Sequence, residues 1–294
     1  MLTVGTAAEL RGALYALRGA GRPGGARRVA FVPTMGALHA GHLSLVAEAR
    51  RRADAVVMSV FVNPLQFGPG EDFARYPRAA ERDAAMARDA DVDLLFMPSV
   101  DVLYPRQPRV RVVPGSMADR WEGAVRPGHF AGVLTVVAKL FHLVAPDVAV
   151  FGQKDAQQVA LVRAMVADLD IPLDLVVAPT VREADGLALS SRNVYLSDAE
   201  RARARHIPEA LAAAERRFAS GERSAAALQD AAHAVLARAP ELTTDYLAVT
   251  DPESLEPAEV AGPGSLLMVA VRAGRTRLLD NVVLGDPTYG TGLA

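Results

Sequence analysis

Short apolar runs rich in β-branched residues alternate with helix-like patterns along roughly the first 180 residues of the chain. Uninterrupted apolar strands in regular alternation with helices are typical of a doubly wound parallel sheet, so we expect an α/β fold here. The expected strands are Arg28–Val32, Ala55–Val62, Asp93–Met97, Val148–Phe151 and Leu173–Val177. The expected helices are Ala7–Arg18 (with a capping box from Thr6 and Glu9), His42–Arg52, Ala79–Asp89, Val133–Val144 and Ala156–Leu169.

The pattern changes after Thr180, where charged, alanine-rich helical segments precede three short apolar runs. A capping box at Ser197–Glu200 opens the first helical segment, which we expect Pro208 to bend. The remaining expected elements are a helix at Ser224–Arg238 and antiparallel strands at Thr244–Thr250, Leu266–Val271 and Leu278–Leu284. We therefore place a domain boundary near Val181, with a parallel-sheet domain at 1–180 and a smaller α+β domain at 181–294.

Composition narrows the function classes. The net charge of −2 over 294 residues predicts no broad basic face, so we expect no nucleic-acid partner. The absence of cysteine excludes disulfides, thiolate metal sites and cysteine nucleophiles. The longest apolar stretch, Val133–Val150, is interrupted by charged residues and proline, and the N-terminus lacks a signal-peptide pattern. We expect a cytoplasmic protein with no membrane partner.

Two histidines, His39 and His42, follow the first expected strand in the stretch PTMGALHAGH, and a helical pattern begins after them. Free backbone N–H groups and the dipole at a helix N-terminus favour phosphate. Paired donors at such a place stabilise charge on a transferring phosphoryl group. The pattern resembles the His-x-Gly-His signature of nucleotidyltransferases that attack the α-phosphate of ATP. The alternative is a pair of structural histidines in a loop.

Two further motifs also follow expected strands. The amides of FVNPLQF suit a small substrate with hydroxyls and a carboxylate, or they simply cap a proline turn. In FGQKDAQQ, Lys154 supplies a mobile charge for phosphate, unless it is an ordinary surface lysine. Asp155 is placed to cap the helix, contact a ribose or influence magnesium, and Gln158 lies one turn beyond Lys154.

Two loops carry less specific signals. The hydroxyls and guanidinium of LSSRN are suited to a phosphate tail, although such a sequence also occurs in ordinary loops. The segment Trp121–Phe130 is either a lid or a connector that ends at a helix N-terminus. The sequence leaves the roles of Glu122, Arg126 and His129 open.

PTMGALHAGH, FVNPLQF, RPGHF, FGQKDAQQ and LSSRN occur in this order, and together they resemble the pantothenate synthetase (pantoate–β-alanine ligase) family. The motifs run from about Phe31 to Asn193, and the domain layout extends the match over nearly the whole chain. The resemblance implies a Rossmann-like ATP- and pantoate-binding domain, a C-terminal domain that closes over the active site, and a homodimer. It also implies condensation of pantoate with β-alanine through a pantoyl adenylate, with ATP as substrate, Mg²⁺ on its phosphates, and AMP and pyrophosphate as products.

Family roles carry over residue by residue onto the matching positions. His42 is the expected proton donor and His39 its phosphate-binding partner, while Gln66, Gln158 and Asn63 are expected to hold pantoate or β-alanine. With the two histidines, the expected catalytic residues are Lys154, Ser190, Ser191 and Arg192. The expected ATP contacts are Met35, Gly36, Ala37, Leu38, His39, Ala40, Gly41, His42, Gly152, Gln153, Lys154, Asp155, Val181, Leu189, Ser190, Ser191 and Arg192.

One departure from the family pattern is Leu189, where methionine is common; the two side chains have similar volumes, so we expect little effect. The main alternative function is that of another His-x-Gly-His nucleotidyltransferase, which would ignore β-alanine. A class I aminoacyl-tRNA synthetase would need a basic RNA surface. A non-catalytic nucleotide sensor would not need the intact set of histidines, lysine and arginine.

Overall fold

The computed structural model describes residues 1–19 and 26–293, which divide into two compact units. Unit 1 comprises residues 1–119, 126–151 and 161–178; unit 2 comprises 120–125, 152–160 and 179–294. Two short segments that precede Pro179 in the sequence thus belong to unit 2.

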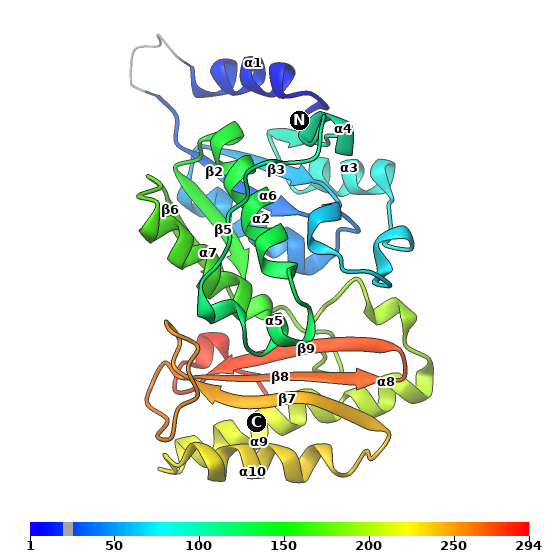
Figure 1. The fold of residues 1–294 in the computed structure, drawn as a ribbon, viewed down its shortest axis with the longest axis vertical. Coiled ribbons are helices and arrows are strands. Elements are labelled where there is room, and N and C mark those ends of the chain that lie inside the picture. The colour runs from blue at the N-terminus through cyan, green and yellow to red at the C-terminus, as the bar shows by residue number, and fades with distance from the viewer. Residues whose placement is uncertain (20–25, 294) are drawn as a thin grey trace. The chain divides into compact units, whose positions relative to one another are not determined.

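Unit 1 is built on a six-stranded sheet with strand order β1-β4-β3-β2-β5-β6 (Figure 1). Its strands are β1 Leu2–Val4, β2 Val29–Thr34, β3 Ala55–Val60, β4 Leu94–Phe96, β5 Val148–Gly152 and β6 Asp174–Ala178. Strand β2 pairs in parallel with β3 on one side and with β5 on the other. The order of the strands therefore reverses between β2 and β5, which is where ligands bind in sheets of this kind.

Most helices of unit 1 begin and end close to the expected residues, and a short helix at Val100–Leu103 was not expected. They are α1 Ala7–Arg18, α2 Ala40–Arg52, α3 Ala80–Asp89, α4 Val100–Leu103, α6 His129–Val144 and α7 Ala156–Asp168, whose first five residues belong to unit 2. The capping box of Thr6 and Glu9 is confirmed. Two starts were predicted too late, because α2 begins at Ala40 and α6 at His129, each after a cap that is not a serine, threonine or aspartate.

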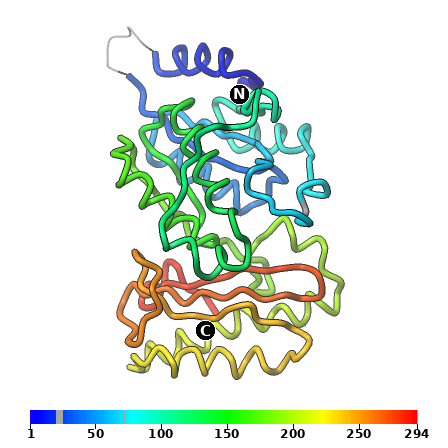
Figure 2. Tube along the Cα trace, in the orientation of Figure 1, coloured from blue at the N-terminus to red at the C-terminus, as the bar shows by residue number. Residues whose placement is uncertain are grey.

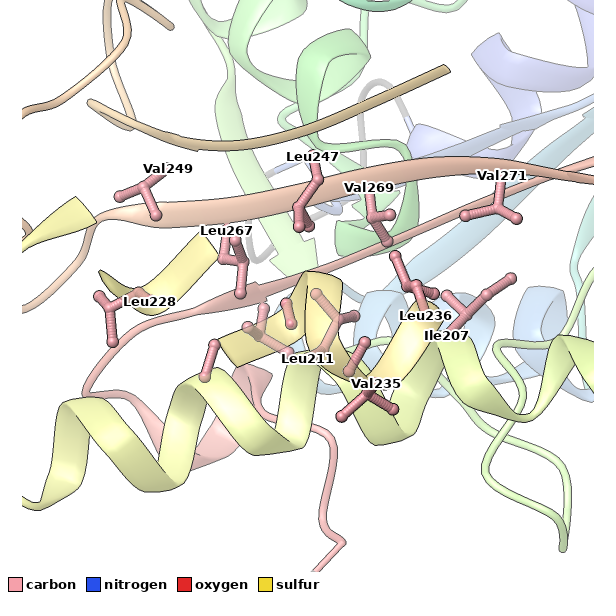
Figure 3. Close-up of a cluster of buried hydrophobic side chains, with 14 of the residues drawn as sticks. Ile207, Leu211, Leu228, Val235, Leu236, Leu247, Val249, Leu267, Val269 and Val271 are labelled. Atoms are coloured by element: carbon pink, nitrogen blue, oxygen red, sulfur yellow. The ribbon is translucent and has the colours of Figure 1, made fainter. Parts of the chain in front are cut away.

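Unit 2 contains a three-stranded antiparallel sheet in the order β7-β8-β9, which confirms the expected strands. The strands are β7 Leu242–Thr250, β8 Leu266–Ala273 and β9 Thr276–Val283; the helices are α5 Glu122–Val125, α8 Asp198–Ala204, α9 His206–Ala219 and α10 Ala225–Leu236. Helices α9 and α10 run side by side in the trace of Figure 2. Their apolar faces pack on the sheet around Leu211, Leu228 and Val269 (Figure 3).

The expected bend at Pro208 is instead a break. Helix α8 ends at Ala204 after its confirmed capping box, and α9 starts at His206. Pro208 is therefore in the first turn of α9, where a missing N–H costs no helical hydrogen bond. Within the described ranges no helix is long and apolar enough to cross a membrane.

Helix α6 touches the turn that follows β3 through a glycine. A Cβ on Gly132 would overlap the carbonyl of Leu65 and would lie 2.6 Å from the backbone nitrogen of Gln66. Both obstacles are backbone atoms, so neither can rotate away. The carbonyl of Gly132 also accepts a hydrogen bond of 3.1 Å from Asn63. The close approach of α6 thus fixes the position of this turn.

We predict that Gly132→Ala lowers the free energy of unfolding by roughly 1–3 kcal/mol, because the added methyl group overpacks a rigid contact. The matched control is Gly12→Ala in α1, where a Cβ meets nothing within 4 Å; it should raise stability by up to about 1 kcal/mol. Urea unfolding of the two variants measures both effects. Equal changes in the two variants would contradict the role given to the Gly132 contact.

Candidate active site

The N-terminus of α2 is capped by its two histidines. His39 is the N-cap residue, and its Nδ1 accepts a hydrogen bond of 3.2 Å from the backbone N–H of Gly41. The Nδ1 of His42 accepts one of 3.3 Å from the backbone N–H of His39. The two rings lie 4.1 Å apart between centroids. This is a reciprocal capping box with imidazoles in place of the usual serine and glutamate.

The cap decides which nitrogen of each ring carries the proton. A ring nitrogen that accepts a hydrogen bond is unprotonated, so in the neutral form each proton is assigned to Nε2. In this form Nδ1 of each ring accepts from the backbone, and Nε2 is the nitrogen that can donate. Both rings lie at the positive end of the α2 dipole, next to the switch point of the sheet. The arrangement suits an anion such as a phosphate.

The loop between β2 and α2 is held by a buried carboxylate that sequence reasoning missed. Asp83, on α3, accepts hydrogen bonds from the backbone nitrogens of Ala37 (2.9 Å) and Leu38 (2.8 Å). Gly36 has φ +84°, and a Cβ there would lie 2.8 Å from an Asp83 oxygen. Ala37 also has positive φ, which costs a non-glycine residue about 1–3 kcal/mol. The carboxylate offsets this strain and fixes the path of the chain into His39.

The amides predicted to hold substrate form a network after β3. Asn63 donates to Gln66 Oε1 at 3.0 Å, and Gln66 donates to the sulfur of Met35 at 3.0 Å. Tyr104, which sequence reasoning missed, donates to Asn63 Oδ1 at 3.1 Å. Burial raises the pKa of Tyr104 to about 12, with Arg111 opposing the shift, so the hydroxyl remains a donor at neutral pH. The structure thus brings three expected site residues together.

The motif RPGHF, whose role the sequence left open, holds the backbone of Gln66. His129 contacts the Gln66 carbonyl through Nδ1 at 2.8 Å, and Arg126 contacts His129 Nε2 at 3.1 Å. Because a guanidinium only donates, Nε2 is the acceptor and the His129 proton is assigned to Nδ1. Glu71 pairs with Arg126 at 2.6 Å. Burial would raise the pKa of Glu71, but the hydrogen bonds and charge of Arg126 outweigh it and hold the pKa below its ordinary value.

In unit 2, the turn after β5 carries the expected phosphate-binding lysine. The 3₁₀ turn Gln153–Asp155 leads directly into α7, and Gln158 is half-buried in the first turn of that helix. Lys154 Nζ lies 3.7 Å from Asp155 Oδ1, and its side chain is 21% exposed. The Gln153 side chain is buried and donates to Asn281 at 2.9 Å. Its amide therefore holds the turn in place.

The expected ATP contacts Val181 and Leu189 face each other across a small hairpin. The backbone nitrogen of Leu189 donates to the carbonyl of Val181 at 2.9 Å. Ser190 then accepts from the backbone nitrogen of Arg192 at 3.2 Å. Lys154 and Ser190 line one small hollow, which opens to solvent. Unit 2 therefore gathers the lysine and the hydroxyl loop around a common space.

Glu122, the remaining residue of open role, takes part in an ion-pair cluster within unit 2. It pairs with Arg277, which also contacts Asp245 at 2.5 Å. The backbone nitrogen of Glu122 donates to Gln157 Oε1 at 2.9 Å. These contacts join residues 120–125 to the rest of unit 2, so Glu122 has a structural role. Of the segment Trp121–Phe130, the last two residues already form the start of α6.

Comparisons with known proteins show the family to which the chain is similar. The family model described as pantoate-beta-alanine ligase matches residues 3–283. The pantothenate synthetase of Acidothermus cellulolyticus is 54% identical over 281 residues, covering 94% of this chain and 89% of that protein. That of Agrobacterium fabrum is 52% identical over 286 residues, covering 97% and 96%.

Solved structures show the same relationship over nearly full length. The crystal structure of pantothenate synthetase from Thermus thermophilus is similar with a TM-score of 0.89 and 51% identity, covering 98% of this chain and 100% of that one. Pantoate-beta-alanine ligase from Francisella tularensis, crystallised in complex with beta-gamma ATP and beta-alanine, has a TM-score of 0.76 and 30% identity, covering 98% and 99%. Sequence, fold and matched length together show that the chain belongs to the pantoate–β-alanine ligase family of enzymes.

Proposed function

We propose that the protein condenses D-pantoate with β-alanine to pantothenate through a pantoyl-adenylate intermediate, releasing AMP and pyrophosphate. The observation that carries the proposal is the imidazole-capped N-terminus of α2, which lies at the switch point of the sheet. The Francisella relative, whose structure is of a complex with beta-gamma ATP and beta-alanine, supports the choice of substrates.

In the first half-reaction, a pantoate carboxylate oxygen attacks the α-phosphorus of ATP. A bond forms between that oxygen and phosphorus, and the bond from phosphorus to the bridging oxygen of pyrophosphate breaks. Negative charge grows on the α-phosphate and the departing pyrophosphate. Donors fixed before the reaction stabilise that charge best. His39, His42, Lys154, Arg192, Ser190 and Ser191 have that role in the proposal.

In the second half-reaction, the amine of β-alanine attacks the carbonyl carbon of the adenylate. The carbon–nitrogen bond forms, the carbon–oxygen bond to AMP breaks, and the amine loses a proton. Asn63, Gln66 and Gln158 are proposed to hold the organic substrates. Water would hydrolyse the adenylate, so the site has to close. On the family resemblance, we assign this closure to the domain expected at 181–294.

Mg²⁺ is proposed to accompany the ATP phosphates, where it would supply positive charge to offset the charge of the phosphates. Mg²⁺ commonly binds through one or two carboxylates together with phosphates and water. Asp155, whose side chain is 49% exposed beside Lys154, fits that mode. Across the described residues no group of three or more histidine or acidic side chains is arranged as a metal site. A homodimer and a cytoplasmic location are also part of the proposal, on the family resemblance and the sequence.

Pyrophosphate release by the purified protein with ATP, Mg²⁺ and D-pantoate, with and without β-alanine, tests the function. We expect sustained turnover only when β-alanine is present, with AMP and pantothenate as products. Release without pantoate would favour another nucleotidyltransferase, and no release with any pair of substrates would contradict catalysis altogether.

Lys154→Ala is expected to slow adenylate formation far more than it weakens pantoate binding, because the charge that Lys154 meets develops in the transition state. Single-turnover kinetics with ATP and pantoate measures the rate, and pantoate titration measures the affinity. A loss confined to pantoate affinity, with an unchanged rate at saturation, would remove Lys154 from the chemical step.

His42→Asn separates the cap from the chemistry. The asparagine Oδ1 can take the place of Nδ1 as acceptor, but nothing replaces the Nε2–H donor. We expect near-normal thermal stability and a kcat lower by about 10²–10³, the usual effect of losing one such donor. His142→Asn, at an exposed helix position, is the matched control and should retain full activity. Equal activity in the two variants would contradict the role of His42.

A further inference from the structure

Strand β9 carries two adjacent buried polar residues, Asp280 and Asn281, in an otherwise apolar stretch. Neighbouring side chains on a strand point to opposite faces of the sheet. Leu278 and Val282, on the same side as Asp280, belong to the core shared with α9 and α10. Asn281 therefore lies on the other face. Neither residue is among those that the family resemblance assigns to the site.

Asn281 uses its whole amide to hold the turn that carries Lys154. Its Nδ2 donates to the carbonyls of Gln153 and Lys154, each at 2.9 Å. Its Oδ1 accepts from Gln153 Nε2 at 2.9 Å. Asn281 is 2% exposed, so water does not replace these bonds easily. Two backbone carbonyls and one amide of this turn thus depend on a single side chain.

Asp280 holds the hairpin that leads to the serine pair. It accepts two hydrogen bonds from Arg182, at 2.6 and 3.0 Å, and one from the backbone nitrogen of Asn281 at 2.8 Å. Arg182 lies next to Val181 and also donates to the carbonyl of Gly186 at 3.1 Å. Asp280 itself lines the small hollow with Lys154 and Ser190. Both segments that carry expected phosphate-binding groups in unit 2 are therefore tied to one dipeptide.

We propose that Asp280 and Asn281 are positioning residues for the ATP half-reaction, setting the distance between the Lys154 turn and the Ser190 loop. The inference rests on the proposed function, because it assigns these segments to ATP phosphates. A charged group accelerates phosphoryl transfer only when it is fixed where charge develops. Asn281 affects the reaction by fixing the position of Lys154. Asp280 affects it by fixing the hairpin that leads to Ser190.

Asn281 gives the cleaner test, because removing Asp280 would leave Arg182 buried without its partner. We expect Asn281→Ala to lower the rate of adenylate formation roughly 10- to 100-fold, as a displacement of about 1 Å can do, with an unchanged KM for pantoate. In a double-mutant cycle, Asn281→Ala should cost little further rate once Lys154 is already alanine. Losses that add in the cycle would overturn the proposal.

The matched control is Gln229→Ala. Gln229, on α10, is also a side-chain amide in unit 2 that bonds to the backbone of another element. It accepts a hydrogen bond of 3.0 Å from the backbone nitrogen of Val249. It should lower stability without lowering the rate of adenylate formation. If both variants lower the rate in proportion to their loss of stability, Asn281 has no positioning role.

A second variant guards against misfolding of the first. Asn281→Asp keeps the acceptor but presents a carboxylate to two carbonyls; when protonated it regains one donor. Its activity relative to wild type should therefore rise as the pH falls towards the pKa of the introduced carboxyl. A relative activity that is flat or falls over this range would contradict the proposal.

Amide hydrogen exchange over residues 152–156 tests whether Asn281 holds this turn, independently of whether the proposed function is correct. We expect faster exchange there in Asn281→Ala and no change in Gln229→Ala. Unchanged exchange in both variants would show that Asn281 does not hold the turn, and it would overturn the proposal. If the wild-type protein released no pyrophosphate, the function would fail while this measurement still decided whether Asn281 holds the turn.

Discussion

The unpaired backbone N–H groups at the start of α2 are the constraint on which the site depends. A helix leaves these donors without partners inside the helix, and here two histidine Nδ1 atoms accept from the first of them. Satisfying the helix therefore also fixes the orientation of both rings, with Nδ1 of each turned to the backbone. The strand order places this helix start at the switch point beside β5. One local requirement of secondary structure thus positions the two rings that the proposal assigns to the ATP phosphates.

Some buried polar side chains have no proposed contact with substrate. They form hydrogen bonds that hold the proposed substrate-binding residues in position. Asp83 fixes the loop ahead of His39, and Tyr104 orients Asn63. In unit 2, Asn281 does the same for the turn of Lys154. These bonds are made within the folded protein before substrate arrives, so the arrangement does not have to be built during the reaction.

Much of the fold could be predicted from the spacing of apolar residues, because short apolar runs indicate buried strands and helical spacing indicates helices. The start of α2 was missed since histidine is not an expected cap, and Pro208 was misjudged because a break just before it made it part of a first helical turn. The ends of strands marked the candidate site motifs, whose ligand contacts stay predictions. Asp83 gave no local signal, since its partners are backbone atoms distant in sequence. Asn281 did give a local signal, because with Asp280 it forms a polar pair within an apolar stretch of β9.

The pantoyl adenylate is the central claim, and transfer of oxygen from pantoate to AMP tests it most directly. With D-pantoate labelled with ¹⁸O in its carboxylate, turnover in the presence of ATP, Mg²⁺ and β-alanine should place one labelled oxygen in the phosphate of AMP. The label follows because the carboxylate oxygen bonds to phosphorus and leaves with AMP when the amine attacks. AMP without label, formed together with pantothenate, would contradict the adenylate and with it the roles given to the residues around α2.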